Sequence, residues 1–232
     1  MSTKNKFIGG VLYIVSTPIG NRDDMTLRGI SVLKSSDLIL CEDTRHSGRL
    51  LKFFDISVRL LSYHDHNAVS RLPLIIDKLI GGSIVSLITD AGTPGISDPA
   101  YRVIRSAIDN GIPVIPVPGA SAVLSALTVS GLPLDRFVFE GFLPVKSGQR
   151  LSRLEMLCSE PRTIVLYVSP HKLIKTLFDI LEVMGDREIS LSRELTKLHE
   201  ETVRGTVSSV LDALSGRTVK GECTLVIRGY TK

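Results

Sequence analysis

The fold of this chain is indicated by one strand and the loop behind it, Ile84-Val85-Ser86-Leu87-Ile88 followed by Thr89-Asp90-Ala91-Gly92-Thr93-Pro94-Gly95-Ile96-Ser97-Asp98-Pro99. The apolar run is typical of a buried strand, and residues 100–108 carry apolar side chains at helical spacing. In open α/β sheets, ligands bind to loops that leave the carboxyl ends of strands. Because its glycines permit close backbone approach and its prolines stiffen it, we expect this loop to hold a ligand. We assign Asp98 and Pro99 to the capping of the next helix.

Strands and helices alternate on both sides of this loop. Before it we expect strands at 11–16, 37–41 and 59–62, with helices at 26–34, around Leu50, Leu51 and Phe54, and at 68–80. After it we expect a helix at 99–109 and a strand at 112–117, whose Pro113 and Pro116 place it at a sheet edge or a crossover. This alternation predicts parallel βαβ units.

A change of composition at Pro118-Gly119-Ala120-Ser121-Ala122 predicts a domain boundary, with an N-terminal α/β domain over 1–118 and a C-terminal one over 119–232. In the second half we expect strands at 137–140, 163–168, 188–192 and 223–228, and helices at 148–159, 170–183 and 206–214. The predicted fold class is therefore α/β, with two α/β domains and a cleft between them. In parallel sheets the loops after strands converge on one edge of each domain.

Composition points to a soluble globular protein. The 232 residues are 43% hydrophobic and 22% charged, and no stretch is long and apolar enough to span a bilayer. The start of the chain, residues 1–6, is polar and does not resemble a signal peptide. Cys41, Cys158 and Cys223 lack the paired spacing of zinc sites and disulfide frameworks, which favours buried free thiols in a reducing cytoplasm. We expect no metal centre and no membrane partner.

Several common catalytic motifs are missing from the sequence. No Gly-x-Gly-x-x-Gly follows the first strand, no Walker-type Gly-Lys-Ser/Thr occurs, and no Gly-x-Ser-x-Gly elbow is present. His64 and His66 flank Asp65 in a polar loop, and we interpret them as exposed loop residues rather than metal ligands. The net charge of +4 is compatible with a polyanionic partner.

Two basic runs follow predicted strands. They are Arg45, His46, Arg49 and Lys52, and then Lys146, Arg150 and Arg153. They fit either solvated helix faces or a surface for a phosphate backbone.

Seven blocks of the sequence, in order, carry a resemblance to a known family. They are Val15-Ser16-Thr17-Pro18-Ile19-Gly20-Asn21, Cys41-Glu42-Asp43-Thr44-Arg45, Ser62-Tyr63-His64-Asp65-His66-Asn67, the loop 89–99, Pro118-Gly119-Ala120-Ser121-Ala122, Gly141-Phe142-Leu143-Pro144 and Ser192-Arg193-Glu194-Leu195-Thr196-Lys197. From Val11 to Arg228 the chain resembles the bacterial small-subunit ribosomal RNA cytidine 2′-O-methyltransferases, a branch of the tetrapyrrole methylase superfamily. Arg22 is a departure, because the family pattern leads us to expect an apolar residue there.

The resemblance implies S-adenosylmethionine as methyl donor, bound in the cleft between the domains, and a ribose 2′-hydroxyl of a decoding-centre cytidine as acceptor. It implies small-subunit ribosomal RNA or the assembled 30S particle as partner, and a homodimer. Two alternatives stay open. One is methylation of a tetrapyrrole or another small acceptor on the same fold, and the other is a non-catalytic RNA-binding protein of the ribosome. Against the latter, only 5% of the residues are aromatic and none is Trp.

The resemblance also implies site residues. The cofactor contacts it implies are Asp90, Ala91, Gly92, Thr93, Pro94, Ile96, Ser97, Ser121, Ala122, Val168, Glu194 and Thr224. A ribose hydroxyl needs a general base, or a cation that stabilises the developing alkoxide, and our candidates are Lys197, Glu200 and His171, which follow strands of the second domain. Our candidates for RNA contacts are Arg22, Glu42, Asp43, Arg45, Arg49, Lys146 and Arg150.

Overall fold

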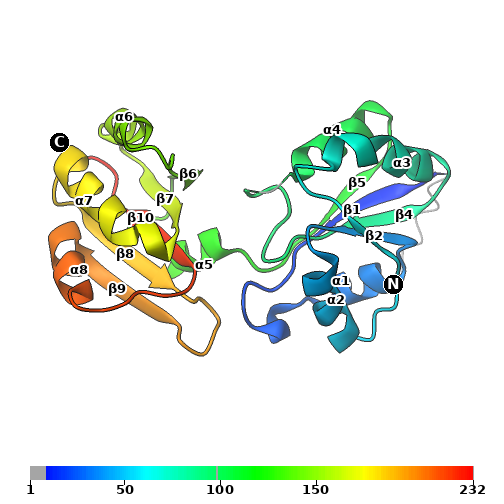
Figure 1. Cartoon of the computed structure of the whole chain (residues 1–232), viewed down its shortest axis with the longest axis horizontal. Coiled ribbons are helices and arrows are strands. Elements are labelled where there is room, and N and C mark those ends of the chain that lie inside the picture. Colours follow the sequence, from blue (N-terminus) through cyan, green and yellow to red (C-terminus); the bar gives the residue numbers. More distant parts are fainter. Residues whose placement is uncertain (1–8, 98, 232) are drawn as a thin grey trace. The chain divides into compact units, whose positions relative to one another are not determined.

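The computed structural model describes residues 9–97 and 99–231 and divides the chain into two compact units (Figure 1). Unit 1 ends at Ser121 and unit 2 begins at Ala122. Each unit is built around its own five-stranded sheet, and the predicted α/β class is confirmed. No described helix has the length and apolar character that crossing a membrane requires.

Unit 1 is a parallel sheet in the order β3-β2-β4-β1-β5 with helices on both faces (Figure 1). Its elements are β1 Val11–Val15, the 3₁₀ turn η1 Arg22–Asp24, α1 Leu27–Lys34, β2 Leu38–Cys41, α2 Thr44–Phe53, β3 Leu60–Ser62, α3 Ala68–Ile80, β4 Ile84–Leu87, α4 Ala100–Asp109 and β5 Val114–Val117. The two prolines predicted an edge or a crossover, and β5 is an edge strand. Pro99 stands at the N-cap of α4, and Asp98, predicted to cap this helix, lies outside the described residues.

The parallel strands of unit 1 are apolar throughout because both faces of the sheet are covered. Leu38 and Leu40 of β2 pack in the cluster formed with α3 and α4. Ile39 and Cys41 of the same strand pack in the opposite cluster with Leu33 of α1 and its neighbours on α2. Successive side chains of a strand point to opposite faces, so a strand with two covered faces lacks polar positions.

Unit 2 departs from the predicted parallel arrangement. Its elements are α5 Ala122–Val129, β6 Phe137–Phe142, α6 Ser147–Leu157, β7 Thr163–Val168, the 3₁₀ turn η2 Pro170–Lys172, α7 Leu173–Met184, β8 Glu188–Arg193, β9 Glu201–Thr206, α8 Val207–Leu214 and β10 Cys223–Ile227. The sheet order is β6-β7-β10-β8-β9, with β6 parallel to β7 but β10 antiparallel to both β7 and β8, and β9 antiparallel to β8. The elements β9 and α5 were not predicted.

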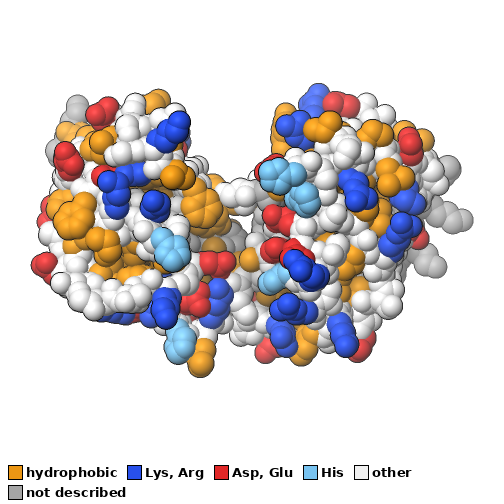
Figure 2. Space-filling model, in the orientation of Figure 1, with side chains coloured by type: hydrophobic (Ala, Val, Ile, Leu, Met, Phe, Trp, Pro, Cys, Tyr) orange, Lys and Arg blue, Asp and Glu red, His pale blue; other side chains and the backbone are white. Residues whose placement is uncertain are grey.

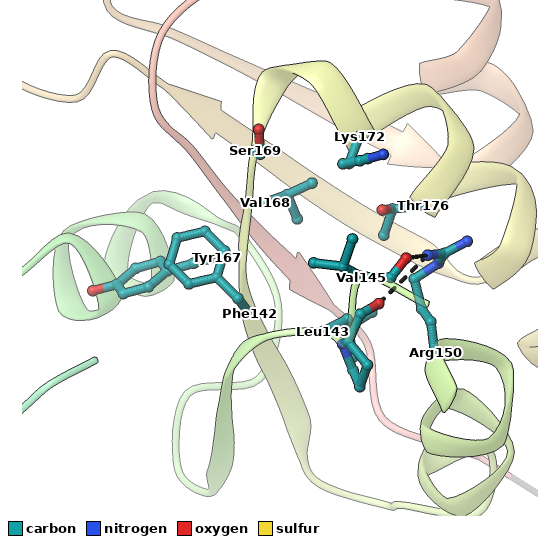
Figure 3. Close-up of a pocket in the computed structure, with 10 residues that line it drawn as sticks. Phe142, Leu143, Val145, Arg150, Tyr167, Val168, Ser169, Lys172 and Thr176 are labelled. Atoms are coloured by element: carbon teal, nitrogen blue, oxygen red, sulfur yellow. Dashed lines mark hydrogen bonds between the residues drawn. The ribbon is translucent and has the colours of Figure 1, made fainter. Parts of the chain in front are cut away.

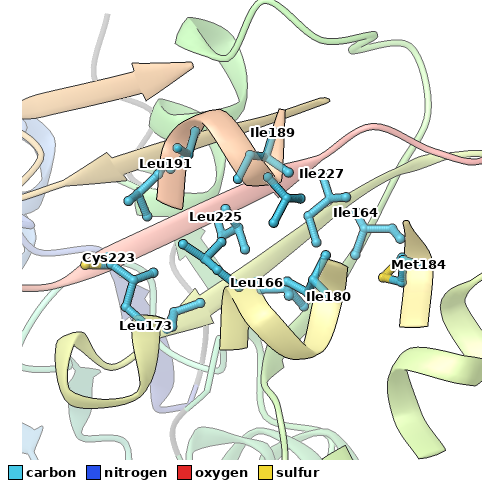
Figure 4. Close-up of a cluster of buried hydrophobic side chains, with 14 of the residues drawn as sticks. Ile164, Leu166, Leu173, Ile180, Met184, Ile189, Leu191, Cys223, Leu225 and Ile227 are labelled. Atoms are coloured by element: carbon cyan, nitrogen blue, oxygen red, sulfur yellow. The ribbon is translucent and has the colours of Figure 1, made fainter. Parts of the chain in front are cut away.

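The core of unit 2 lies mainly on one face of its sheet (Figure 4). Leu166, Leu191 and Leu225, from three adjacent strands, are buried with Leu173 and Ile180 of α7. The other face is covered by α5, whose Val123, Ala126 and Leu127 contact Val165 and Val226. The strands β7 and β10 are thus buried on both faces although they are antiparallel, and their apolar runs resemble those of a parallel sheet.

The cysteines are free thiols, as predicted, and two of them are buried. Burial raises the pKa of both Cys41 and Cys223 to about 11. We therefore predict that these two thiols do not react with a thiol-specific reagent in the native protein at neutral pH, because the nucleophilic thiolate is scarce and inaccessible. Labelling followed by mass spectrometry checks this. In denaturant all three cysteines should be modified, and rapid native labelling of Cys41 or Cys223 would contradict the prediction.

Candidate functional site

The loops behind three adjacent strands of unit 1 are joined by hydrogen bonds. Because β4, β1 and β5 are neighbours and parallel, their carboxyl ends lie side by side. Thr17, after β1, forms an isolated antiparallel bridge with Gly92, with its N–H 2.9 Å from the Gly92 oxygen and its own oxygen 3.1 Å from the Gly92 nitrogen. The Thr17 hydroxyl donates to the carbonyl of Thr89 at 2.9 Å. The loop 89–99 is therefore fixed to the end of β1.

Thr93 connects this loop to the two others. Its hydroxyl lies 2.9 Å from that of Ser16 and donates to the carbonyl of Ala120, behind β5, at 3.2 Å. Gly119 permits this packing, since a Cβ atom there would lie 2.9 Å from the Cβ of Ser16. One threonine side chain therefore ties all three loops together.

The path of the loop needs unusual backbone conformations. Gly92 has a φ of 86° and Gly95 a φ of 92°, values that glycine adopts without strain. Ser97 has a φ of 70°, which is uncommon for a residue with a side chain. The apolar side chain of Ile96 is 44% exposed on the same loop. Strained backbone and an exposed apolar side chain are features of ligand-binding loops.

One oxygen of the Asp90 carboxylate is unsatisfied in this region, whereas the carboxylate also accepts a hydrogen bond from the Asp43 backbone. The Oδ1 atom of Asp90 is buried and has no hydrogen-bond partner among the described residues. Burial raises the pKa of Asp90, the charge of His46 lowers it, and Glu42 raises it further. Glu42 itself is engaged, because its carboxylate accepts a 2.5 Å hydrogen bond from the hydroxyl of Thr89. A buried acceptor without a partner is costly, so Asp90 is suited to a ligand that donates a hydrogen bond.

Unit 2 brings three of its four predicted cofactor residues, Val168, Glu194 and Thr224, to one edge of its sheet, and the fourth, Ala122, begins α5. Here β7 and β8 end and β10 begins, with Cys223 paired to both Val168 and Arg193. Val168 and Thr224 are buried at this edge, and Glu194 follows it with a φ of 49°. The strands β7 and β8 run parallel to each other across β10, so their following loops still share an edge despite the antiparallel strand between them.

Lys197 is held as a cation at this edge. Its Nζ donates to Glu194 at 2.9 Å and to Glu222 at 3.0 Å. Burial opposes the charge of Lys197, but the hydrogen bonds to Glu194 and Glu222 outweigh it and raise its pKa. The hydrogen bond from Lys197 in turn lowers the pKa of Glu194. A paired ammonium cannot take up a proton, so of the two roles considered for Lys197 this environment favours stabilisation of negative charge over that of a base.

The other two catalytic candidates lie on the same side of unit 2. Glu200 is exposed and its carboxylate accepts from the backbone N–H of Thr196 at 2.5 Å. It lies in the same turn as Lys197, whose carbonyl accepts from the Glu200 N–H at 3.1 Å. His171 is exposed on η2, directly after β7.

Among the predicted RNA contacts of unit 1, the arginines are exposed, whereas the carboxylates of Glu42 and Asp43 accept hydrogen bonds within the protein. Arg22, Arg45 and Arg49 are exposed, and Figure 2 shows Lys and Arg side chains gathered over this part of unit 1. The Arg22 guanidinium lies 4.7 Å from the centre of the Phe53 ring. Arg22, which departs from the family pattern, therefore makes a cation–π contact at the surface. Asp43 caps α2, accepting from the N–H of Arg45 at 2.7 Å.

Arg150 is not at a surface, and its prediction as an RNA contact is wrong. It is 4% exposed, and its Nε lies 2.5 Å from Asp179. Its Nη1 donates to the carbonyls of Val145 at 3.0 Å and Pro144 at 3.4 Å. The guanidinium therefore supports the chain before α6, whereas Lys146 of the same run is exposed.

This buried pair yields a stability prediction. Asp179→Ala leaves a buried guanidinium without its counter-charge, which should reduce the free energy of unfolding by about 3–5 kcal/mol. Asp109→Ala is the matched control, because Asp109 forms an exposed ion pair with Arg105 at 2.8 Å and such pairs contribute about 0–1 kcal/mol. Urea titration followed by circular dichroism measures both. Equal losses in the two variants would contradict the structural role of Arg150.

The sequence predicted two exposed histidines in the loop after β3, and the structure shows His66 exposed but His64 half-buried. His64 shares a 3.0 Å side-chain hydrogen bond with Asn67, which also accepts from the His64 backbone N–H at 2.9 Å. Within residues 9–97 and 99–231, no three His, Cys, Asp or Glu side chains are grouped as metal ligands would be.

Comparison with known proteins shows which family this chain belongs to. The family model described as tetrapyrrole (corrin/porphyrin) methylases matches residues 11–211, and the chain belongs to this family. The predicted family and enzyme class, a methyltransferase that uses S-adenosylmethionine, are confirmed.

Individual relatives narrow the comparison. The chain is 48% identical over 223 residues to a protein of Synechocystis sp. named ribosomal RNA small subunit methyltransferase I, covering 96% of this chain and 80% of the relative. A Mesorhizobium japonicum protein of the same name is 49% identical over 218 residues, covering 93% and 74%. Among solved structures, the cobalt precorrin-4 methyltransferase CbiF shares the fold with a TM-score of 0.69 and 20% identity, covering 94% of both chains.

Two residues that were not among the predicted site residues, Ser16 and Thr17, contact the predicted cofactor loop. Ser16 and Thr17 bind the cofactor-loop candidates through their hydroxyl and backbone groups. The signal available was two hydroxyl residues directly at the end of the first strand, a position where parallel sheets gather ligand contacts.

Proposed function

We propose that this chain transfers a methyl group from S-adenosylmethionine to the 2′-hydroxyl of a cytidine in small-subunit ribosomal RNA. The observation that carries the proposal is the 48% identity, over 96% of the chain, to the Synechocystis protein named ribosomal RNA small subunit methyltransferase I. The likeness to CbiF, at 20% identity, concerns the fold alone. A tetrapyrrole acceptor is therefore the weaker candidate.

The residues of unit 1 fit the methyl donor. S-adenosylmethionine supplies an activated methyl group on a sulfonium that is its own leaving group, so the chain needs no nucleophile. Asp90 offers a buried acceptor for a ribose hydroxyl or an ammonium group, and Ile96 offers apolar surface. The positive φ of Gly92 and Gly95 brings backbone within reach of a ligand. We propose Asp90, Thr93 and their loop neighbours as the donor's contacts, together with Ser121, Ala122, Val168, Glu194 and Thr224.

The chemistry left to the protein is positioning and charge stabilisation. Removing the proton from a ribose hydroxyl creates an alkoxide, which a fixed cation stabilises. Lys197 is such a cation, held by two carboxylates. We propose His171 or Glu200, both exposed on unit 2, as the group that accepts the proton.

The acceptor is large and anionic, and exposed cations should bind it. We propose that Arg22, Arg45 and Arg49 of unit 1 and Lys146 of unit 2 contact RNA phosphates. We further propose action in the cytoplasm, as a homodimer, on ribosomal RNA or the assembled small subunit.

The acceptor class is tested directly by radiolabelled methyl transfer. Tritiated S-adenosylmethionine is incubated with the protein and, separately, small ribosomal subunits, protein-free small-subunit RNA or a uroporphyrinogen-type tetrapyrrole. We expect label in RNA, mapped by nuclease digestion and mass spectrometry to the ribose of a cytidine. Label in the tetrapyrrole but in neither RNA sample would reject the proposal.

The role of the Thr93 hydroxyl predicts a loss of cofactor affinity. Thr93→Val keeps the side-chain shape but removes both hydrogen bonds, each of which contributes about 0.5–1.5 kcal/mol. We expect affinity for S-adenosylhomocysteine, measured by calorimetry, to fall about tenfold, equivalent to about 1.4 kcal/mol. Thr128→Val is the control, because that hydroxyl bonds only within α5, to Leu124 at 3.0 Å and Ser125 at 3.0 Å. Equal affinity in wild type and Thr93→Val would disprove this role.

The basic face of α2 predicts salt-dependent RNA binding. We expect Arg49→Ala to weaken binding uniformly across RNA sequences and to reduce the slope of log affinity against log salt by about 0.7–0.9. Filter binding between about 50 and 200 mM salt measures the slope. Arg105→Ala removes an exposed arginine from α4, on the opposite face of the sheet, and should leave the slope unchanged. A common slope for all three proteins would exclude Arg49 as a phosphate contact.

A further inference from the structure

Unit 2 contains a pocket that shares Val168 with the proposed donor contacts, whereas its other lining residues have no proposed contact with donor or RNA (Figure 3). It has a volume of about 180 Å³ and opens where β6 and β7 end. Its apolar lining includes Phe142, Val145, Tyr167 and Val168, and its polar lining consists of Arg150, Ser169, Lys172 and Thr176. Figure 3 shows the two aromatic rings together at one end of the pocket and Lys172 at the other.

The pocket is held open by structure around it. The pairing of β6 with β7 shifts register between Phe139 and Gly141, and Gly141 has a φ of 66°. This irregularity displaces the end of β6, including Phe142. On the other side the buried Arg150 binds the carbonyls of Pro144 and Val145. Because a buried ion pair fixes Arg150 in turn, this wall is preformed.

The aromatic end of the pocket is suited to a planar ring. The Phe142 and Tyr167 rings lie 5.5 Å apart between centroids, tilted by 52°, and Phe142 is 61% exposed. An exposed aromatic beside a preformed cavity offers a face on which a base can stack. Burial raises the pKa of the Tyr167 phenol, which keeps it a neutral hydrogen-bond donor. Lys172 is exposed at the far end, where it can meet a phosphate.

We propose that this pocket receives the pyrimidine base of the acceptor nucleotide, extruded from its RNA stack, with Lys172 on an adjoining phosphate. The inference rests on the proposed function and names the place on unit 2 where its substrate binds. Size supports it, since an apolar cavity of about 150 Å³ holds one benzene ring, and this pocket is slightly larger. Enzymes that carry out chemistry on a base take that base out of the stack into such a pocket, so a protein pocket can hold an extruded base.

Substitutions in the pocket distinguish binding of the acceptor base from binding of the methyl donor. Phe142→Ala should lower kcat/KM for the small-subunit substrate about five- to a hundredfold, the range expected for one lost stacking contact. It should leave the Kd of S-adenosylhomocysteine unchanged, and Phe142→Tyr should restore kcat/KM. Phe178→Ala is the matched control, because Phe178 is a 56% exposed phenylalanine of unit 2 on α7, outside this pocket.

A second pair of variants tests the proposed contact between Lys172 and a phosphate. Lys172→Ala should raise KM for RNA, whereas Lys175→Ala, an exposed lysine of α7 that does not line the pocket, should not. A Phe142→Ala enzyme that loses affinity for S-adenosylhomocysteine but keeps its KM for RNA would overturn the inference in favour of the adenine ring as occupant. Unchanged kinetics in Phe142→Ala would overturn it as well. Wild-type protein that methylates no RNA would instead reject the proposed function, and the inference with it.

Discussion

The candidate site of unit 1 depends on the short antiparallel bridge between Thr17 and Gly92. All five strands of this sheet are parallel, so nothing in the sheet itself fixes the long loop behind β4. The bridge fixes it by pairing backbone groups at the end of β1 with a glycine at positive φ. Thr93 can then reach both Ser16 and Ala120, and the half-buried carboxylate of Asp90 is held next to Glu42 and His46.

Much of unit 1 could be predicted from the sequence, for a physical reason. A doubly covered parallel strand must be apolar at every position, so runs such as Leu38–Cys41 are conspicuous. Loops after such strands must gather at one edge, and residues 89–99 do follow β4 at that edge, next to the ends of β1 and β5. The bridge from Thr17 was not predictable, because it depends on backbone conformations that local sequence does not specify.

Unit 2 shows where such reasoning fails. Its strand β9, Glu-Thr-Val-Arg-Gly-Thr, is a partly exposed edge strand that lacks an apolar run. The strands β7 and β10 are antiparallel yet covered on both faces, so their composition imitates parallel strands. In the sequence Arg150 could not be distinguished from its exposed neighbour Lys146. Its burial depends on an ion pair with Asp179, which lies 29 residues away.

We propose that the loops after β1, β4 and β5, which Thr17 and Thr93 join by hydrogen bonds, belong to a site for S-adenosylmethionine. The most direct measurement is the melting temperature of the protein with increasing S-adenosylhomocysteine. A ligand that binds only the folded state stabilises it by about 2.7 kcal/mol at a hundred times its Kd. We expect the melting temperature to rise with the logarithm of ligand concentration, and an unchanged melting temperature at saturating concentrations would contradict a site for S-adenosylmethionine.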